Sequence, residues 1–395
     1  MTVLRKHLFD LPEGVIYLDG NSLGPLPKSV GARLSSMIAD EWGAQLIRGW
    51  NGAGWMDQPR RVGDRVASLI GASDGTVTMG DTLSIKVYQA LDAALKMRPD
   101  RRKIVSDSGN FPTDLYMAGG LIRSLDKGHR LETPKPEDVI AAIDEDTAVV
   151  MLTQVDYRTG RLHDMAAISK LARDKGAVMI WDLAHSAGAL PVDLAGSGCE
   201  FAVGCTYKYL NGGPGAPAFI YVRPDLAADV DPGLAGWLGH EAPFAFDIDY
   251  RPAPGVARMR VGTPPVMQMT ALEEALGVWD GLDMQDVRAA SIALQEVFIR
   301  QVEAKVPDLT LASPRDPATR GSQVSFAHPE GYAAMQALIA RGVIGDFRAP
   351  DIMRFGFTPL FIDEDDVLAA ADHVAAVFTD RLWDNPEFQK RAAVT

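Results

Sequence analysis

Lys208 stands between two tyrosines in the stretch "GCTYKYLNGGPG" (204–215), directly before a glycine-rich turn. The apolar run "EFAVGC" (200–205) precedes it and is typical of a buried strand. A lysine amine in a partly apolar pocket has a lowered pKa and can act as a nucleophile. The glycines allow the backbone to pass close to a bulky ligand. Read alone, however, a lysine beside glycines is more often a phosphate or surface contact.

Asp182 ends another apolar run, "AVMIWD" (177–182), and His185 follows it in "DLAHSAGALP". A carboxylate at the buried end of a strand needs a partner. The protonated nitrogen of a pyridine ring is such a partner, and pyridoxal phosphate enzymes use an aspartate in this way. A structural aspartate that caps the following turn is the other interpretation of this pattern.

Two further segments open a helix directly after an apolar run. In "GDTLS" (80–84) the amides and hydroxyl of Thr82 and Leu83 would lie where a helix N-terminus attracts phosphate. Serine and threonine begin most helices, so this signal is weak by itself. In "NFPTDLY" (110–116) Phe111 and Asp114 follow a strand end, although an ordinary helix start with a core phenylalanine has the same pattern.

Short apolar runs alternate with helical stretches between residues 76 and 222. This alternation predicts an α/β fold with a mostly parallel sheet covered by helices on both faces. Such sheets bind ligands outside the carboxyl ends of their strands, which would bring the polar residues above together. Apolar residues at three-and-four spacing predict an amphipathic helix over 28–48, and residues 223–265 are expected to be rich in loops.

Helices and strands mix after about residue 284, which predicts a smaller C-terminal α+β domain. We therefore expect three parts. Residues 1–50 form an N-terminal segment that packs on the small domain and the active site. Residues 51–270 form the large, ligand-binding domain, and residues 271–395 form the small domain.

The 395 residues are 47% hydrophobic and 23% charged, an ordinary globular composition. The net charge of −13 argues against nucleic acid and anionic membrane as partners, but leaves room for a small anion in a local basic pocket. No stretch approaches the ~20 apolar residues of a spanning helix. Cys199 and Cys205 stand in apolar surroundings without a metal-ligand pattern, so we expect buried thiols, no metal and a cytoplasmic protein.

Seven motifs spread along nearly the whole chain are "YLDGNSLGPLP" (17–27), "NFPTDLY" (110–116), "WDLAHSAGALPVDL" (181–194), "GCTYKYLNGGPG" (204–215), "GWLGHE" (236–241), "GTPP" (262–265) and "GVIGDFRAPDIMRFGFTPL" (342–360). The Asp-x-x-His and Tyr-Lys pairs within them indicate only the wider class V aminotransferase-like group. With the motifs at 17–27, 236–241 and 342–360 added, the chain resembles the kynureninase family, most closely its bacterial form. The resemblance implies a fold-type I, pyridoxal phosphate-dependent transferase-like fold.

The resemblance also implies roles. Lys208 would bind the cofactor as a Schiff base and carry the substrate's α-proton, Asp182 would pair with the pyridine nitrogen, and Tyr207 would donate a proton. Arg354 would hold the substrate α-carboxylate, with Asn21 as a further substrate contact. The residues implied to contact the cofactor are Thr82, Leu83, Phe111, Thr113, Asp114, Thr153, Asp182, His185, Tyr207, Lys208, Trp237 and Thr263.

Leu83 departs from the family pattern, which often has a hydroxyl residue there, so only its backbone amide would serve. Candidates for contact with the substrate's aromatic ring are Trp50, Asn51 and Trp55. Tyr209 has no expected role beyond packing.

The implied activity is hydrolysis of L-kynurenine, and of its 3-hydroxy form, to anthranilate or 3-hydroxyanthranilate and L-alanine by Cβ–Cγ cleavage. It would belong to tryptophan catabolism or NAD biosynthesis. The implied assembly is a homodimer with active sites at the subunit interface, in which Trp237 and Thr263 reach across to the partner.

Three other functions fit the sequence less well. A cysteine desulfurase or selenocysteine lyase needs a reactive cysteine in the second half, but the last cysteine is Cys205. An ordinary aminotransferase fits the fold but not the family motifs. A non-catalytic regulatory protein would carry an added basic DNA-binding helix pair or lack Lys208.

Overall fold

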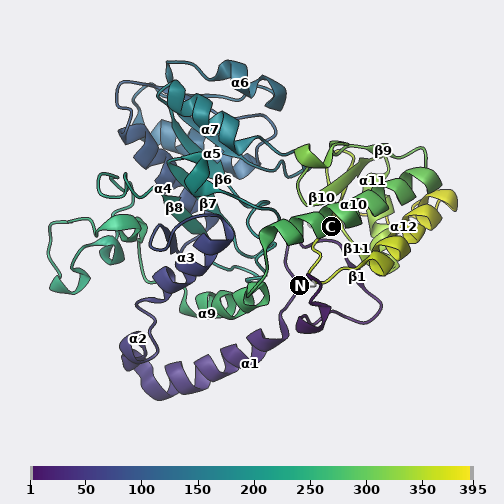
Figure 1. The fold of residues 1–395 in the computed structure, drawn as a ribbon, viewed down its shortest axis with the longest axis horizontal. Coiled ribbons are helices and arrows are strands. Elements are labelled where there is room, and N and C mark those ends of the chain that lie inside the picture. Colours follow the sequence, from purple (N-terminus) through teal and green to yellow (C-terminus); the bar gives the residue numbers. More distant parts are fainter. Residues whose placement is uncertain (1–2, 392–395) are drawn as a thin grey trace.

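A seven-stranded sheet organises the larger part of the computed structural model, which describes residues 3–391 (Figure 1). The strands lie in the order β2–β8–β7–β6–β5–β3–β4. Their bounds are β2 Val77–Met79, β3 Lys103–Val105, β4 Arg130–Glu132, β5 Thr147–Thr153, β6 Val178–Asp182, β7 Phe201–Gly204 and β8 Phe219–Val222. Strand β8 runs antiparallel to both neighbours and the other pairs are parallel. The prediction of a mostly parallel sheet is therefore confirmed.

Helices cover both faces of this sheet, as the continuous apolar strands predict. Along β6, Val178 and Ile180 belong to one buried apolar cluster, while Met179 and Trp181 belong to the other. Helices α4 and α5 pack into the first cluster, and α3 and α7 into the second. The helices of this part are α3 Gln58–Leu69, α4 Leu83–Lys96, α5 Pro112–Leu125, α6 Val139–Ala142, α7 Met165–Asp174 and α8 Leu194–Ser197.

A second, antiparallel sheet of four strands lies in the C-terminal part, in the order β12–β13–β10–β9. Its bounds are β9 Thr310–Leu311, β10 Gln323–Ala327, β12 Asp346–Arg348 and β13 Ile352–Gly356. The neighbouring helices are α9 Val266–Ala275, α10 Met284–Lys305, α11 Gly331–Ala340 and α12 Glu364–Thr379. Phe298 of α10 packs its ring against Phe326, Phe355 and Phe357 at centroid distances of 6.2, 5.0 and 5.2 Å. The exact division into domains at about residue 270 stays a prediction.

The N-terminal segment pairs with the C-terminal part through β1 (Ile16–Tyr17), which runs parallel to β11 (Val343–Ile344). Beyond it, the prediction of one regular helix over 28–48 is wrong after Ser36. Helix α1 (Lys28–Ser36) continues as a π-helical stretch (Met37–Gly43), a 3-10 turn (Leu46–Arg48) and the short α2 (Gly49–Gly52).

A regular helix cannot run to residue 48, because the φ of 54° at Leu46 lies in the left-handed region that such a helix cannot contain. Val30 and Met37 are buried, but the later part of the apolar stripe has no core to pack on among the described residues. Ile38, Trp42 and Leu46 are 47%, 55% and 63% exposed.

Residues 223–265 contain only short 3-10 turns, Trp237–Gly239, Pro243–Ala245 and Gly255–Met259, in agreement with the predicted loops. In Figure 1 this segment extends away from the sheet at the left of the view. Among residues 3–391, no helix is both long and apolar enough to cross a membrane.

Gly24 marks the place where the N-terminal segment crosses the loop that carries Lys208. Its amide donates to the carbonyl of Tyr207 at 2.8 Å. A Cβ at this position would lie 2.4 Å from both the carbonyl oxygen of Lys208 and Oδ1 of Asn211. Only glycine allows the two segments to approach so closely.

Gly24→Ala is therefore expected to lower the free energy of unfolding by about 1–3 kcal/mol, because the added methyl group must push the two segments apart. The measurement is the urea midpoint. Gly31→Ala is the matched control, since nothing lies within 4 Å of a Cβ there and the residue is in α1. The control should be stabilised by up to about 1 kcal/mol. Equal midpoints for the two variants would contradict the close approach.

Candidate active site

Polar residues meet at the carboxyl ends of three adjacent strands. Thr153 ends β5 and lies opposite Asp182, which ends β6, and Asp182 in turn lies opposite Val203 of β7. Lys208 follows β7 by a short loop. The parallel register thus brings together residues that are far apart in the sequence, as expected for a sheet of this type.

The Lys208 amine lies in a pocket of aromatic rings and one imidazole. Its Nζ is 2.9 Å from Nε2 of His185, and it lies 6.0 Å and 5.8 Å from the ring centroids of Phe111 and Tyr207. Burial lowers the pKa of Lys208, which favours the neutral, nucleophilic amine. Burial, and then the charge of Lys208, hold the pKa of His185 well below its usual range. The neutral imidazole and the Lys208 amine share this hydrogen bond through Nε2, and its direction depends on the tautomer of the ring.

Two buried carboxyl groups face this amine. Oδ1 of Asp182 accepts the amide of Ala184 at 2.9 Å, and its Oδ2 lies 3.3 Å from the hydroxyl of Thr153. Burial raises the pKa of Asp182 to about 6. Burial, and then the charge of Asp182, raise the pKa of Asp114 well above its ordinary value. Among residues 3–391, Lys208 is the cation whose charge acts on both carboxyl groups.

A second centre surrounds Arg354, whose side chain is 1% exposed. Its Nε donates to Oδ1 of Asp346 at 2.6 Å, and Nη2 donates to Oδ2 of the same carboxylate. Nη2 also donates to the hydroxyl of Ser22 at 2.8 Å, and Nη1 donates to the carbonyl of Tyr157. Burial alone would raise the pKa of Asp346, but the hydrogen bonds from Arg354 lower it.

Five further residues named from the sequence lie in the N-terminal segment, at the starts of α4 and α5, and after β7. Asn21 is fully buried, and neither polar atom of its amide has a hydrogen-bond partner. Thr113 lies in the first turn of α5, and Thr82 and Leu83 begin α4 without a side-chain cap. Tyr209 is buried and donates to the carbonyl of Ser322 at 3.1 Å.

Trp237 and Thr263 are not brought to Lys208 in this single chain. Trp237 is 42% exposed and packs on Phe244, and Thr263 is exposed. The ring-contact candidates Trp50 and Trp55 pack on one another at 5.8 Å, and Asn51 is exposed. Over residues 3–391, no hydrogen bond or ring contact joins any of these five residues to the Lys208 pocket.

Sequence reasoning missed Ser22, Asn110, Tyr157 and Asp346. Asn110 lies in a quoted motif, and its Oδ1 contacts the Thr153 hydroxyl. Asp346 and Arg354 face each other across two antiparallel strands, so opposite charges at a hairpin spacing could have shown the pair. Tyr157 contributes a backbone carbonyl, for which a side-chain pattern carries no signal.

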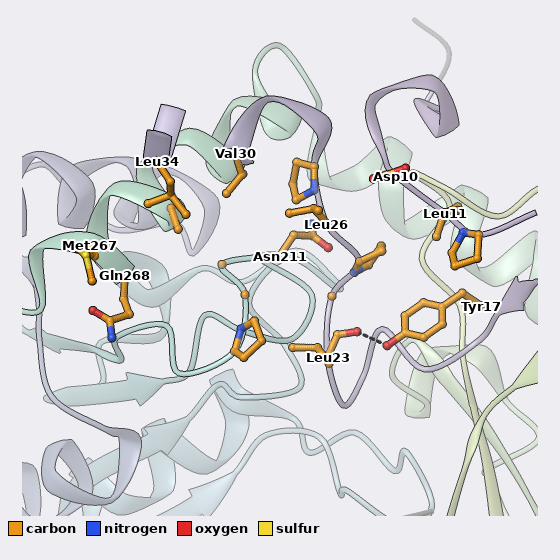
Figure 2. Close-up of a pocket in the computed structure, with 18 of the residues that line it drawn as sticks. Asp10, Leu11, Tyr17, Leu23, Leu26, Val30, Leu34, Asn211, Met267 and Gln268 are labelled. Atoms are coloured by element: carbon orange, nitrogen blue, oxygen red, sulfur yellow. Dashed lines mark hydrogen bonds between the residues drawn. The ribbon is translucent and has the colours of Figure 1, made fainter. Parts of the chain in front are cut away.

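An apolar groove of about 810 Å³ has a lining that includes none of the residues of the two centres described above (Figure 2). The N-terminal segment, the loop after Lys208 and the start of α9 form its walls, and Tyr17 donates to the carbonyl of Leu23 at 2.8 Å across it. Asp10 is its one charged lining residue, and no lysine, arginine or histidine lines it. The groove therefore offers contact area rather than catalytic chemistry.

Solved structures of low sequence identity share this fold. The apo cysteine desulfurase from Thermococcus onnurineus NA1 matches with a TM-score of 0.79 at 18% identity, over 95% of this chain and 97% of that one. A mutant of C-DES with glycine covalently linked to the PLP cofactor matches with the same TM-score and identity, over 94% of this chain and 98% of that one. The chain therefore has the fold of this cysteine desulfurase and of the PLP-linked C-DES, which confirms the predicted fold class.

Sequence comparison is more specific. A family model described as "Kynureninase C-terminal domain" matches residues 287–374, and a DegT/DnrJ/EryC1/StrS aminotransferase family model matches residues 126–200. A kynureninase from Pseudomonas fluorescens is 51% identical over 99% of this chain and 95% of its own length. The chain belongs to the kynureninase family.

The residues of the Lys208 pocket fit pyridoxal phosphate. Oδ2 of Asp114 and Nδ1 of His185 are buried without a hydrogen-bond partner, as expected of groups that face a polar ligand. Asp182 offers a buried carboxylate to a pyridinium N–H, and Lys208 offers an amine to an aldehyde. The uncapped N-terminus of α4 at Thr82 leaves backbone N–H groups for a phosphate.

The raised pKa of Asp182 predicts how pH affects the cofactor-free protein. The carboxyl group titrates near pH 6 in the fold, against 3.8 for the free group. Below about pH 4 the carboxyl group is protonated in the folded and the unfolded protein, so its burial in charged form costs nothing. As the pH rises through about 6 the buried group ionises, and the free energy of unfolding falls by on the order of 3 kcal/mol.

Asp182→Asn removes this titration while keeping an acceptor for the amide of Ala184. Above about pH 6 the cofactor-free variant should be more stable than wild type by on the order of 3 kcal/mol, and below about pH 4 the gain should vanish. Urea midpoints at the two pH values measure the difference. Asp174→Asn, at an exposed i,i+4 ion pair, should change stability by under about 0.5 kcal/mol. A pH-independent difference between wild type and Asp182→Asn would contradict the assignment.

Proposed function

We propose that this protein hydrolyses L-kynurenine, and also 3-hydroxy-L-kynurenine, to anthranilate or 3-hydroxyanthranilate and L-alanine. The reaction adds one water and breaks the Cβ–Cγ bond. It belongs to tryptophan catabolism or to the supply of pyridine nucleotides. The observation that carries the proposal is the 51% identity, over 99% of the chain, to a kynureninase.

Pyridoxal phosphate is the cofactor, and when bound it supplies an electron sink for negative charge on the substrate carbon next to the amino group. Lys208 would bind it through the amine, and Asp182 would pair with its ring nitrogen. Phe111 would contact the ring, and Asp114 and His185 its substituents. The other residues of one chain that would hold it are Thr82, Leu83, Thr113, Thr153 and Tyr207.

The substrate's α-carboxylate binds at Arg354, with Asn21 as a neighbouring contact. Arg354 has five N–H groups, of which Asp346, Ser22 and Tyr157 take four. A carboxylate therefore binds through the remaining N–H of Nη1 and by displacing a neutral acceptor such as the Ser22 hydroxyl. The Asp346 contact stays in place and keeps the guanidinium in position.

Proton transfers fall to Lys208 and Tyr207. Burial lowers the pKa of Lys208, so its amine accepts the proton that leaves the substrate's α-carbon. Burial raises the pKa of Tyr207, so its phenol is protonated at neutral pH and serves as a donor in the later steps.

The two cysteines argue against desulfurase chemistry, although the fold is shared with cysteine desulfurases. Burial raises the pKa of Cys199 to about 12 and that of Cys205 to about 11. Both thiols are buried and protonated at neutral pH, whereas sulfur transfer requires an accessible thiolate.

The functional unit is a cytoplasmic homodimer with active sites at the subunit interface. Trp237 and Thr263 are exposed in the single chain, as expected of residues that complete the partner's cofactor site. The exposed stripe of Ile38, Trp42 and Leu46 and the apolar groove beside α1 give a second copy a large apolar area to cover.

Purified protein should release anthranilate from L-kynurenine, which its fluorescence reports. Lys208→Ala should abolish this activity and the cofactor absorbance that borohydride bleaches, because no amine remains for the covalent link. Lys170→Ala, at an exposed lysine, is the control and should behave as wild type. An alanine-dependent transamination of a keto acid without anthranilate release would instead identify an aminotransferase.

A hybrid dimer tests whether Trp237 completes the partner's site. Lys208→Ala and Trp237→Ala should each have little activity alone, because every site lacks one of the two residues. A purified hybrid with one subunit of each kind contains one intact site, so it should regain about half of the wild-type activity. A hybrid as inactive as its parents would mean that Lys208 and Trp237 of the same chain act together.

A further inference from the structure

The carboxyl group of Asp19 takes no part in the cofactor and substrate contacts proposed above. Asp19 follows β1, and its backbone carbonyl accepts the amides of Ser22 and Leu23 at 2.9 and 3.0 Å, which fixes a tight turn. The Oδ1 atom of Asp19 is buried and has no hydrogen-bond partner. The Ser22 hydroxyl lies within reach of Asp19, but its one hydrogen is donated to Asp346.

The backbone places Asp19 beside Asp346 and Arg354. The amide of Leu18 donates to the carbonyl of Ile344 at 2.7 Å, and the amide of Gly356 donates to the carbonyl of Leu18 at 2.6 Å. The carboxyl groups of Asp19 and Asp346 therefore lie side by side, and the charge of Asp346 acts on Asp19.

Two ionised carboxylates only accept, so a contact of this kind needs one proton between them. Asp346 has two hydrogen bonds from Arg354 and a contact of 2.8 Å from Arg348, which favour its ionised form. The proton therefore belongs to Asp19.

The pKa of Asp19 agrees with this geometry. Burial, and then the charge of Asp346, raise it to about 8. The other titratable and charged groups that face Asp19 are Tyr17 in β1, Asp346 and Arg348 in β12, Arg354 in β13 and Tyr209 after β7. Burial raises the pKa of both phenols, so they stay neutral in this range.

The charge of the whole cluster follows from these assignments. Arg348 and Arg354 contribute two positive charges, and Asp346 contributes one negative charge. With Asp19 protonated, the cluster therefore carries one net positive charge. With Asp19 ionised, it carries none.

We propose that Asp19 is a specificity-determining residue of the substrate site, because its protonated carboxyl group leaves the Arg354 cluster with the single positive charge that admits the substrate's carboxylate. The inference rests on the proposed binding of that carboxylate at Arg354. Entry of one carboxylate neutralises the cluster. Ionisation of Asp19 places a further negative charge beside Arg354, and this charge repels the substrate's carboxylate.

The test is the pH dependence of KM for L-kynurenine in the holoenzyme. If only the protonated form binds well, KM of wild type should rise about tenfold between about pH 7 and pH 9, because a group that titrates near pH 8 loses most of its protons there. Asp19→Asn is uncharged, and its amide still donates to Asp346. Apart from the effect of the substrate's own amine, which titrates in the same range, the KM of this variant should change by less than about twofold. That effect is common to both proteins, so the ratio of the wild-type KM to the variant KM reports the titration of Asp19 alone.

Two controls separate charge from structure. Glu13→Gln removes an exposed carboxylate from the same segment, outside the apolar groove, and should keep the wild-type rise in KM. The kcat values of wild type and Asp19→Asn should stay in a constant ratio across the pH range, because the proposal concerns binding. Parallel KM profiles in wild type and Asp19→Asn, or a flat wild-type profile, would overturn the proposal. Absence of anthranilate at every pH would instead reject the proposed function.

A second variant and a direct measurement cover the case in which Asp19→Asn fails to fold. Asp19→Ser is uncharged and also has a hydrogen to donate to Asp346, so its KM should be as independent of pH as that of Asp19→Asn. In wild type, infrared spectra should lose a protonated-carboxyl C=O band between about pH 7 and pH 9, and saturating L-alanine should move this loss to higher pH. A band that L-alanine does not move would overturn the proposal.

Discussion

The buried guanidinium of Arg354 receives its acceptors from three distant parts of the chain. Asp346 lies beside it in the small antiparallel sheet, Ser22 comes from the N-terminal segment, and Tyr157 follows β5 of the large sheet. A buried cation without partners is costly, so these acceptors hold the three parts in one arrangement. Geometry at the proposed substrate site and cohesion between the sheets thus depend on the same side chain.

The Lys208 pocket shows the opposite balance of stability and function. Asp182, Asp114 and His185 are buried with raised or lowered pKa values, and two of them have polar atoms without partners. Without a ligand, such groups reduce stability. The apolar clusters on both faces of the large sheet offset this loss, so the fold tolerates a preorganised polar site.

The strand ends that carry Thr153, Asp182 and Lys208 could be predicted because each follows a continuous apolar run, and parallel register then brings them together. Strand β4 escaped prediction because its residues are only partly buried at the sheet edge. The contact of Asp19 with Asp346 could not be predicted either, since it depends on the long-range pairing of β1 with β11. The apolar residues between 28 and 48 have a helical period, but periodicity does not tell whether Ile38, Trp42 and Leu46 pack within their own chain.

The pairing of the chain's beginning with its end also sets an order in time. Ser22 and Asp346 are 324 positions apart, so a ribosome that adds 5–20 residues per second needs roughly 16 to 65 seconds between them. During this interval the N-terminal segment has neither β11 nor the Arg354 cluster to pair with, although its amphipathic helix is already outside the ribosome. The newly made segment therefore exposes apolar side chains until the C-terminal part is made, and the Arg354 cluster is among the last parts of the molecule to form.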